Sequence, residues 1–277
     1  MITAIPRIAI AVPDFAQAVS VFRDSFGMPV QDYSSRTVTP LGAHVGMCVP
    51  LGGSNIELMA PANPALPLSQ ALQKFLNRRG QGPYAMMLEA PDPNAEADDL
   101  LERGVKVLPL MAGAGGRDVH PSSTHGVLVR VYPENSAPPP AERPSDELGL
   151  SGIDRTIIAT LDVSLAAQAY GAGLGLEMDD AVIDPDRGVL AARGRAPAGG
   201  DIELVSIVDS AQPFAQAIGH HLDQAGEGIF ALGLLCDDPA QAASVLAQRG
   251  LNASDPGSGQ HDFTVLGTRF ILQQRTG

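Results

Sequence analysis

The chain has 277 residues, of which 44% are hydrophobic and 18% charged, a composition typical of a soluble globular protein with sizeable cores. Its 18 basic and 31 acidic residues give a net charge of −13, and the sequence has no run rich in lysine and arginine. These numbers exclude nucleic acid and an anionic membrane surface as expected partners. A small anionic ligand is not excluded, because a pocket can be locally basic on an acidic protein.

The ends and the cysteines indicate a cytoplasmic protein. The first residues lack the basic segment of a signal peptide, and no apolar run approaches the ~18 residues that cross a membrane. Cys48 and Cys236 each lie in a short apolar run and are expected to be buried free thiols, since a secreted disulfide framework would be denser.

The first predicted element is a strand in RIAIAVP, which begins at Arg7. Asp14 then stands at a helix N-cap position, and the amphipathic helix that follows ends at Gly27. Short strands come next, the last two joined by a Gly-Gly hairpin turn at 52–53. The final strand, SNIELMAP, carries Glu57 among apolar residues. A carboxylate in a core needs a partner, because an unpaired buried charge costs several kcal/mol or is neutralised.

This order of elements, βαβββ, recurs four times and indicates a duplication. The segment from Arg7 matches the segment from Arg155 with an offset of 148 residues (155 − 7), and residues 82–104 match residues 228–250. The units start near residues 5, 83, 153 and 229, and further helices are expected over 67–80 and 211–226. Glu57 has its counterpart, Glu203, in the strand GDIELVSI.

The composition of the middle of the chain predicts two domains. Residues 135–150 are rich in proline and charge, as interdomain linkers are. We therefore expect a first domain over 1–134 and a second over 151–277, each with two βαβββ units.

Four tandem βαβββ units with openings such as RIAIAVPDFAQAVSVFRDSFGM resemble the vicinal oxygen chelate superfamily of glyoxalases, bleomycin-resistance proteins, methylmalonyl-CoA epimerases and extradiol dioxygenases. The resemblance covers nearly the whole chain, and VHPSSTHGVLVRVYPEN is similar to the closing strand of the epimerase branch. It implies an α+β fold in which two units pair into one cupped mixed β-sheet around one site. Four units then make two cups.

Most members of this superfamily bind a divalent metal in the cup, through a His, a Glu or Gln, a second His and a Glu. The positions that match these ligands are Arg7, Glu57, Ala85 and Arg130 in the first half, and Arg155, Glu203, Ala231 and Ile271 in the second. Only the glutamates can ligate, and an arginine would repel the ion. The comparison therefore predicts no family-type metal and no other cofactor.

Each cup instead has an arginine where the first histidine would stand. We expect Arg7 to pair with Glu57 and Arg155 with Glu203, so that a guanidinium replaces the positive charge of the ion. The pair is either purely structural or part of a catalytic site. In the second interpretation Glu57 is a general base, while Arg7 and Arg130 stabilise an enolate oxygen. Because the position of Arg130 is Ile271 in the second half, the first cup is expected to hold the chemistry, and Arg155 and Glu203 to serve substrate binding.

Other residues are candidates for ligand contacts, each with an ordinary alternative. Tyr84 opens a strand of the first cup and either lines a pocket or packs in the core. His120 and His125 flank the HPSSTH loop and either contact a ligand or lie in solvent. Arg78 and Arg79 end a predicted helix, where they complement its dipole or hold an anionic group such as a CoA phosphate.

Three functions remain open from the sequence. The first is a metal-independent isomerase, epimerase or lyase acting on a small carbonyl or carboxylate compound or an acyl-CoA. The second is a non-catalytic binding protein of the bleomycin-resistance type, and the third a metal-dependent dioxygenase or glyoxalase. In each, the partner is a small molecule, and the chain is a monomer or a homodimer.

Overall fold

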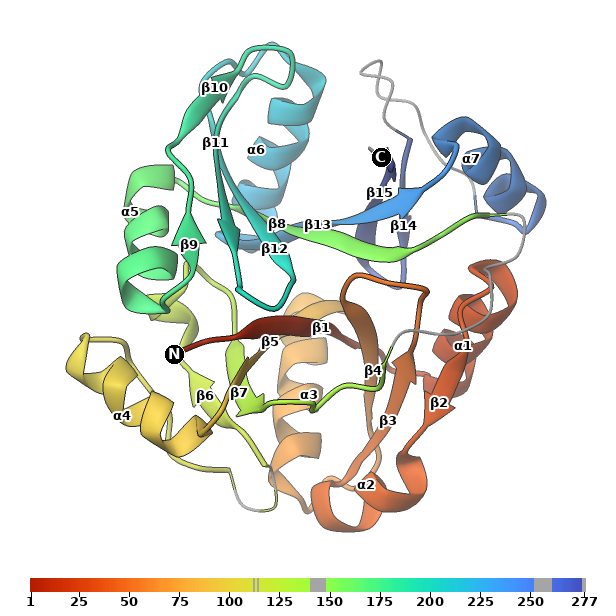
Figure 1. Cartoon of the computed structure of the whole chain (residues 1–277). Helices are drawn as coiled ribbons and strands as arrows, with labels where there is room; N and C mark the ends of the chain where they lie inside the picture. The colour runs from red at the N-terminus through yellow and green to blue at the C-terminus, as the bar shows by residue number, and fades with distance from the viewer. Residues whose placement is uncertain (112, 114, 140–147, 252–260, 276–277) are drawn as a thin grey trace.

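Two mixed β-sheets form the framework of the molecule (Figure 1). The computed structural model describes residues 1–111, 113, 115–139, 148–251 and 261–275. The strand order is β2-β3-β4-β1-β5-β7-β6 in the first sheet and β10-β11-β12-β8-β13-β15-β14 in the second, where β9 also pairs with β11. The predicted α+β fold, with two paired units in each sheet, is confirmed.

The elements of the first half follow the predicted order. They are β1 (Ala4–Ala11), α1 (Phe15–Ser20), a π-helical turn (Val21–Ser25), β2 (Val30–Asp32), α2 (Ser34–Leu41), β3 (Ala43–Cys48), β4 (Asn55–Pro61), α3 (Pro67–Arg79), β5 (Gly82–Ala90), α4 (Pro93–Glu102), β6 (Arg117–Val119), a 3₁₀ turn (Pro121–Ser123) and β7 (Val129–Pro133). Helix α2 falls where only strands were expected. It forms because Asp32 accepts a hydrogen bond from the N–H of Ser34 and Gly42 ends the helix at φ 75°.

The second half repeats this order. It contains β8 (Gly152–Ala159), α5 (Val163–Gln168), a π-helical turn (Ala169–Gly173), β9 (Glu177–Met178), β10 (Val182–Asp184), β11 (Val189–Arg195), β12 (Asp201–Ile207), α6 (Pro213–Ala225), β13 (Gly228–Cys236), α7 (Pro239–Gln248), β14 (Asp262–Val265) and β15 (Thr268–Gln274). None of the helices in the described ranges is long and apolar enough to cross a membrane.

An aspartate begins the first helix of all four units. The side chains of Asp14, Asp92, Asp162 and Asp238 each accept a hydrogen bond from a backbone N–H of the first helical turn. These bonds satisfy donors that a helix start leaves without an intrahelical partner. The N-cap predicted from the repeat is therefore present in every unit.

Each sheet has two different faces, because side chains alternate along a strand. Ile8 and Ile10 of β1 point into a core that contains buried residues from both halves. Arg7 and Ala9 point the other way, toward the face that α3 covers in the first half. We call this the inner face; α6 covers its counterpart in the second sheet.

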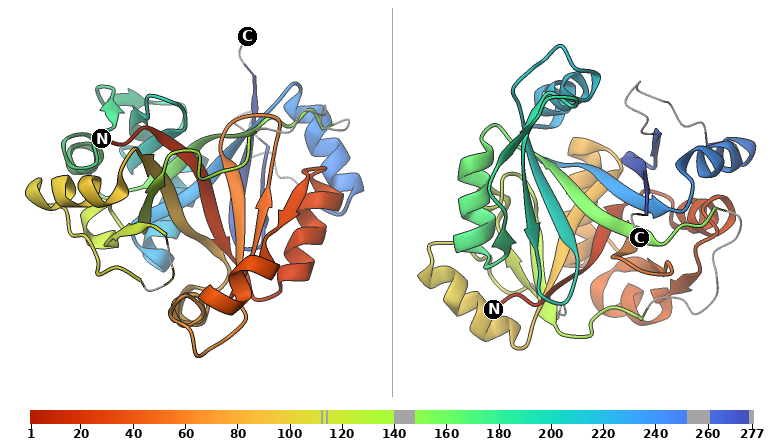
Figure 2. Two further views of the ribbon diagram at one scale, coloured as in Figure 1. Left: turned by 60° about the horizontal axis from the view of Figure 1, so that its bottom comes forward. Right: turned by 45° about the horizontal axis from the view of Figure 1, so that its top comes forward.

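The halves hold each other through reciprocal backbone contacts. The N–H of Ser54, at the tip of the β3–β4 hairpin, donates to the carbonyl of Ile153, and the N–H of Ile5 donates to the carbonyl of Gly199 over 2.9 Å. Figure 2 shows the corresponding β11–β12 turn beside the start of β1. The sheets therefore share one core and exchange hairpin tips.

The described parts of the predicted linker pack against the domains instead of standing free. Residues 135–138 lie against the inner face of the first sheet, and the side chains of Leu148 and Leu150 are buried in the shared core. Residues 140–147 of the linker lie outside the described ranges. The core contains residues of both halves and therefore crosses the predicted domain boundary. The division into domains at residues 134 and 151 thus stays a prediction.

Candidate functional site

The polar residues of the first cup lie in one row across the inner face of the sheet. The register pairs Arg7 of β1 with Asn55 of β4 and with Met87 of β5, and pairs Met87 with Arg130 of β7. Asp118 of β6 lies opposite Arg130. Residues that pair directly across strands project from the same face of a sheet, so the arginines stand on one surface.

The ion pair predicted between Arg7 and Glu57 is present. Nε of Arg7 donates to Oε2 of Glu57 over 2.9 Å, and the two residues are only 4% and 6% exposed. The guanidinium also lies over the ring of Tyr132, 4.5 Å from its centroid. A buried carboxylate thus has the cation that it needs, and aromatic stacking fixes the orientation of that cation.

A segment that follows β7 covers this pair. Nη1 of Arg7 donates to Oγ of Ser136 over 2.6 Å, and both the N–H and the hydroxyl of Ser136 donate to Oε1 of Glu89. The amide of Asn55 donates to the carbonyl of Pro138. We call residues 135–138 the strap. The sequence marked it only as the start of a linker, so its contact with the cup was missed.

Arg130 has a carboxylate partner that sequence reasoning did not find. Its Nε and Nη2 both donate to Asp118, the latter over 2.6 Å, and both residues are buried. Burial alone would lower the pKa of the guanidinium, but the hydrogen bonds and charge of Asp118, together with Tyr132, outweigh it and raise the pKa above its ordinary value. Alternation along VRVYP and GRDV gave no sign that these two strands lie side by side.

A cavity of about 490 Å³ is lined by residues of this polar row, of the strap and of α2. Its lining includes Arg7, Glu57 and Arg130, the three residues predicted to be catalytic. In the described ranges Arg7 donates through Nε and Nη1 to Glu57 and Ser136, which leaves its Nη2 for a ligand oxygen. Arg130 donates through Nε and Nη2 to Asp118, and the side chain of Tyr132 is also close enough to stabilise its charge.

The second cup differs from its prediction. Nη1 of Arg155 lies 3.6 Å from Oε1 of Glu203, but the hydrogen bonds of Arg155 go to Asp154 and, over 2.6 Å, to the amide oxygen of Gln273. Ile271 does occupy the position of Arg130. Gly233 of β13 pairs with both Arg155 and Ile271, just as Met87 of β5 pairs with both Arg7 and Arg130. The second cup thus lacks the second cation of the first.

Glu203 has a different principal partner, Arg187. Two nitrogens of this arginine donate to the two carboxylate oxygens of Glu203, over 2.8 and 3.0 Å. Burial would raise the pKa of Glu203, but Arg187 outweighs it and lowers the pKa below its ordinary value. Arg187 lies in the turn between β10 and β11, and its only sequence signal was a Pro-Asp-Arg-Gly turn.

Apolar side chains fill the inner face of the second sheet around this pair. Ile157, Val205, Phe214 and Ile218 form a buried cluster there, together with Ile271. The Arg187–Glu203 pair thus lies within an apolar core, as structural ion pairs do. Arg7 and Glu57, in contrast, border a cavity. The substrate-binding roles of Arg155 and Glu203 stay predictions.

The other predicted ligand residues lie in another cavity. Tyr84, His120 and His125 line a hollow of about 690 Å³ between the halves. Nδ1 of His120 accepts from the N–H of Ser122, and Nδ1 of His125 lies 2.9 Å from Oε1 of Glu227. Burial raises the pKa of Tyr84 to about 12. The structure therefore separates these three residues from Arg7 and Glu57.

Comparison with known proteins places the chain in a family. A model of the glyoxalase/bleomycin resistance protein/dioxygenase superfamily matches residues 7–120. The chain is 34% identical over 132 residues to the mitochondrial methylmalonyl-CoA epimerase of Mus musculus, an alignment that covers 45% of this chain and 70% of the relative. The chain belongs to this superfamily.

Two further similarities extend this assignment. An ethylmalonyl-CoA/methylmalonyl-CoA epimerase of Cereibacter sphaeroides is 32% identical over 140 residues, which cover 47% of this chain and 98% of the relative. The structure of a mutant 4-hydroxymandelate synthase from Streptomyces coelicolor superposes on 100% of this chain and 93% of its own, with a TM-score of 0.73 at 14% identity. The superfamily member therefore has the two-domain version of the fold.

The prediction that the chain takes no cofactor is wrong for a member of this family. The matched superfamily includes dioxygenases, and the whole chain shares the fold of 4-hydroxymandelate synthase, so a divalent metal is the general expectation for such a cup. The residues at the family positions do not fit that ion: carboxylates hold Arg7 and Arg130, and the described ranges contain no group of three or more His, Cys, Asp or Glu suited to a metal. We therefore derive no step through a metal.

Proposed function

We propose that this superfamily member is an isomerase of the epimerase type, or a lyase, that acts on a small carboxylate or acyl thioester in the first cup. The observation that carries the proposal is the buried Arg7–Glu57 pair, which borders a cavity together with a second cation, Arg130. The similarity to two epimerases of acyl-CoA substrates supports the same reaction class.

The residues divide the proposed chemistry between them. Glu57 takes the proton from the carbon next to the ligand carbonyl, the electron pair of that C–H bond forms a C=C bond, and the π pair of the carbonyl moves onto its oxygen. Nη2 of Arg7 then donates to the oxygen that becomes negative, and the positive charge of Arg130 stabilises it. Transfer of a solvent proton to the other face of the carbon completes an epimerisation, and loss of a leaving group from the enolate completes a lyase reaction.

The strap contributes one wall of the site. Ser136 holds it to Arg7 and to Glu89, so that residues 135–138 form one wall of the cavity. This wall reduces the water around the site, which strengthens the interaction between a guanidinium and a developing oxyanion because less water screens it.

Exchange of the substrate proton with solvent tests the proposal. Purified protein is incubated in D₂O with methylmalonyl-CoA or a short malonate, with and without added divalent metal, and loss of the α-proton signal is followed by NMR. We expect exchange with the wild type and a loss of about 100-fold or more in Glu57→Gln. Glu102→Gln, which changes an exposed glutamate of α4, is the matched control. Unchanged exchange in Glu57→Gln would refute the proposal.

A binding protein of the bleomycin-resistance type is the second candidate. One observation favours it: both cations of the first cup already have a carboxylate partner, so the site is neutral before a ligand enters. Calorimetry that finds tight binding of a small anion, with no exchange or turnover under any of the conditions above, would support this function over the enzyme.

A further inference from the structure

A groove runs between the two halves at the far end of α3 from the strap. It consists of two hollows of about 690 and 350 Å³, which share five lining residues: Phe75, Arg79, Pro83, Ala225 and Ile229. We call it the interdomain groove. Both halves contribute to it, so neither half contains it alone.

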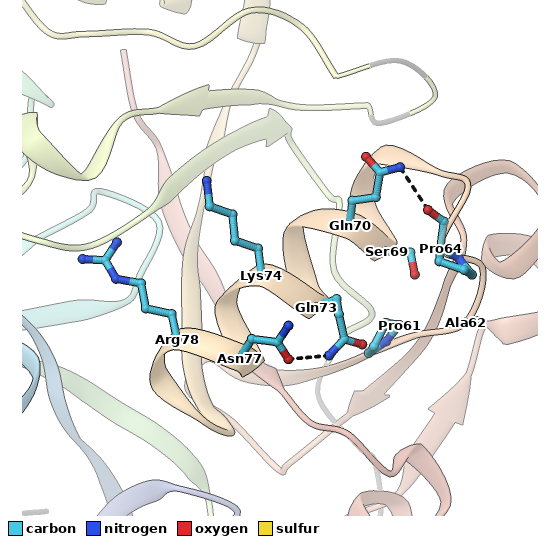
Figure 3. Close-up of a pocket in the computed structure, with 9 residues that line it drawn as sticks. All are labelled: Pro61, Ala62, Pro64, Ser69, Gln70, Gln73, Lys74, Asn77 and Arg78. Atoms are coloured by element: carbon cyan, nitrogen blue, oxygen red, sulfur yellow. Dashed lines mark hydrogen bonds between the residues drawn. The ribbon is translucent and has the colours of Figure 1, made fainter.

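The groove gathers a large share of the basic residues of an acidic chain. Lys74, Arg78 and Arg79 come from α3, Arg269 from β15, His120 and His125 from the loop before β7, and His220 and His221 from α6. Four of the six histidines and one of the two lysines of the chain are thus in its lining. Figure 3 shows Lys74 and Arg78 projecting from α3, away from the Gln73–Asn77 hydrogen bond on the same helix.

The cations of α3 have no anionic partner in the part of the chain that the structure describes. The side chains of Lys74, Arg78 and Arg79 make no hydrogen bond or ion pair there. Burial and the neighbouring Arg78 lower the pKa of Arg79. Glu227 is the one carboxylate among the described lining residues, and it is already bonded to His125.

His221 adds an unsatisfied buried atom to the wall of the smaller hollow. Its Nε2 is buried and has no hydrogen-bond partner among the described residues. Burial, then Arg79 and Arg269, lower its pKa, which keeps the ring neutral. Because Nε2 has almost no accessible surface, His221 contributes its ring to the wall of this hollow and no hydrogen bond to a ligand in it.

Aromatic rings line the same groove beside the cations. The rings of Phe75 and Tyr84 meet edge to face at 5.2 Å, and His221 packs against Phe230 at 5.6 Å. Arg269, which is paired with Asp262, lies 4.9 Å from the centroid of Phe230. Apolar walls with a few convergent polar groups are typical of small-molecule sites, and unpaired guanidinium groups suit phosphate.

We propose that the interdomain groove binds a phosphorylated ligand of the nucleoside diphosphate type, with Lys74, Arg78 and Arg79 on the phosphates and the aromatic walls on the base. A role of Arg78 and Arg79 in stabilising the end of α3 would explain those two residues. It would not explain why Lys74 and the rings of Phe75 and Tyr84 line the same hollow beside them.

The ligand group can come from two sources. One is a free nucleotide, and the other is the nucleotide portion of a coenzyme A thioester. Only the second source rests on the proposed function. It is consistent with the position of Tyr84, which lines the groove and is close enough to Arg130 and Asp118 for their charges to act on its hydroxyl.

Calorimetry on the full chain tests the groove with ADP, coenzyme A and adenosine as probes. We expect ADP to bind, with an affinity that falls as salt rises, and adenosine to bind at least ten-fold more weakly. The double variant Arg78→Ala/Arg79→Ala should weaken ADP binding about ten-fold or more. Arg36→Ala, which removes an exposed arginine of α2, should leave it unchanged.

The outcomes separate the sources and can overturn the proposal. Coenzyme A binding ten-fold tighter than ADP identifies the thioester source, and equal or weaker binding identifies a free nucleotide. Lys74→Ala, an exposed single change, replaces the double variant if that fails to fold. No ADP binding, equal affinity for adenosine, or unchanged affinity in the groove variants overturns the proposal. Glu57→Gln should bind ADP as the wild type does, because Glu57 does not line the groove. A failure of the catalytic proposal can therefore be distinguished from a failure of the groove proposal.

Discussion

Arg7 and Glu57 come from parallel neighbouring strands, β1 and β4, and their side chains meet on the inner face with 2.9 Å between Nε and Oε2. The contact places a buried negative charge beside a buried positive one. Breaking such a pair from one side leaves the other charge without compensation, which costs more than the pair contributes as a whole.

A double-mutant cycle on this pair should show strong coupling. Arg7→Met and Glu57→Gln should each lower the free energy of unfolding. Arg7→Met should lower it by about 3–5 kcal/mol, because it leaves the buried carboxylate of Glu57 without a cation. The double variant should lose clearly less than the sum of the two single losses. Urea denaturation followed by circular dichroism measures all four proteins.

Additive losses would contradict the coupling. They would mean that solvent in the cavity, or Ser136 and Tyr132, already compensates each charge separately. A further control is the exposed pair Arg23–Asp24, where Asp24→Asn should change stability little, since both side chains are more than half exposed.

Acid should destabilise the second cup through Glu203. Arg187 lowers the pKa of Glu203 in the folded protein below its ordinary value of 4.5, so this group stabilises the fold fully above that value. The stabilisation is lost as the pH falls through the lower folded pKa. Arg187→Gln should therefore reduce stability at pH 7 and make the loss between pH 4.5 and pH 3 smaller than in the wild type.

The measurement is the urea midpoint at pH 7, 4.5 and 3 for both proteins. Arg195→Gln is the control, because Arg195 and its partner Asp179 are each 49% exposed and should contribute little. A pH dependence in Arg187→Gln as steep as in the wild type would show that other carboxylates dominate acid unfolding.

Gly126 should tolerate a methyl group much less well than Gly104. Both have a left-handed backbone, with φ 84° and 81°, so the conformational penalty of alanine is the same, about 1–2 kcal/mol. A Cβ on Gly126 would lie 1.8 Å from the carbonyl oxygen of Glu227 in the other half, whereas one on Gly104 meets nothing within 4 Å.

Thermal unfolding of Gly126→Ala and Gly104→Ala compares the two positions directly. Gly126→Ala should be less stable than Gly104→Ala by at least about 2 kcal/mol. Equal stabilities would mean that the halves move apart at this contact without cost.

Neither cysteine should react in the folded protein. Both are buried, and burial raises the pKa of Cys236 to about 11 and that of Cys48 well above its usual value. Only the thiolate attacks a disulfide reagent. DTNB at pH 8 should therefore release no thionitrobenzoate within minutes from native protein and two equivalents from protein in guanidinium. One rapid equivalent from native protein would contradict the prediction.

Local signals predicted much of the fold correctly. The four N-cap aspartates, the helix-ending glycines and the offset between the repeats all depend on residues close in sequence, where spacing and conformational preference are readable. Even the contact between Arg7 and Glu57 followed from the resemblance, because the family fold brings those two positions together.

Contacts that depend on side-chain choice were not readable. Arg155 stands at the position where the partner of Glu203 was expected, but the turn residue Arg187 makes the shorter contact. Nothing in the sequence favours Arg187 over Arg155. Asp118 went unnoticed because strand β6 has only three residues. Ser136 reads as part of a proline-rich linker, although its hydroxyl bridges Arg7 and Glu89.

The exchange of hairpin tips, in which Ser54 meets Ile153 and Ile5 meets Gly199, is the contact pattern of a two-fold dimer within one polypeptide. In a true dimer, dilution would dissolve such an interface and any binding surface built across it. Here the covalent connection holds each half near the other at a high effective concentration. The surface between the halves is therefore assembled at any expression level, without a second molecule of the chain.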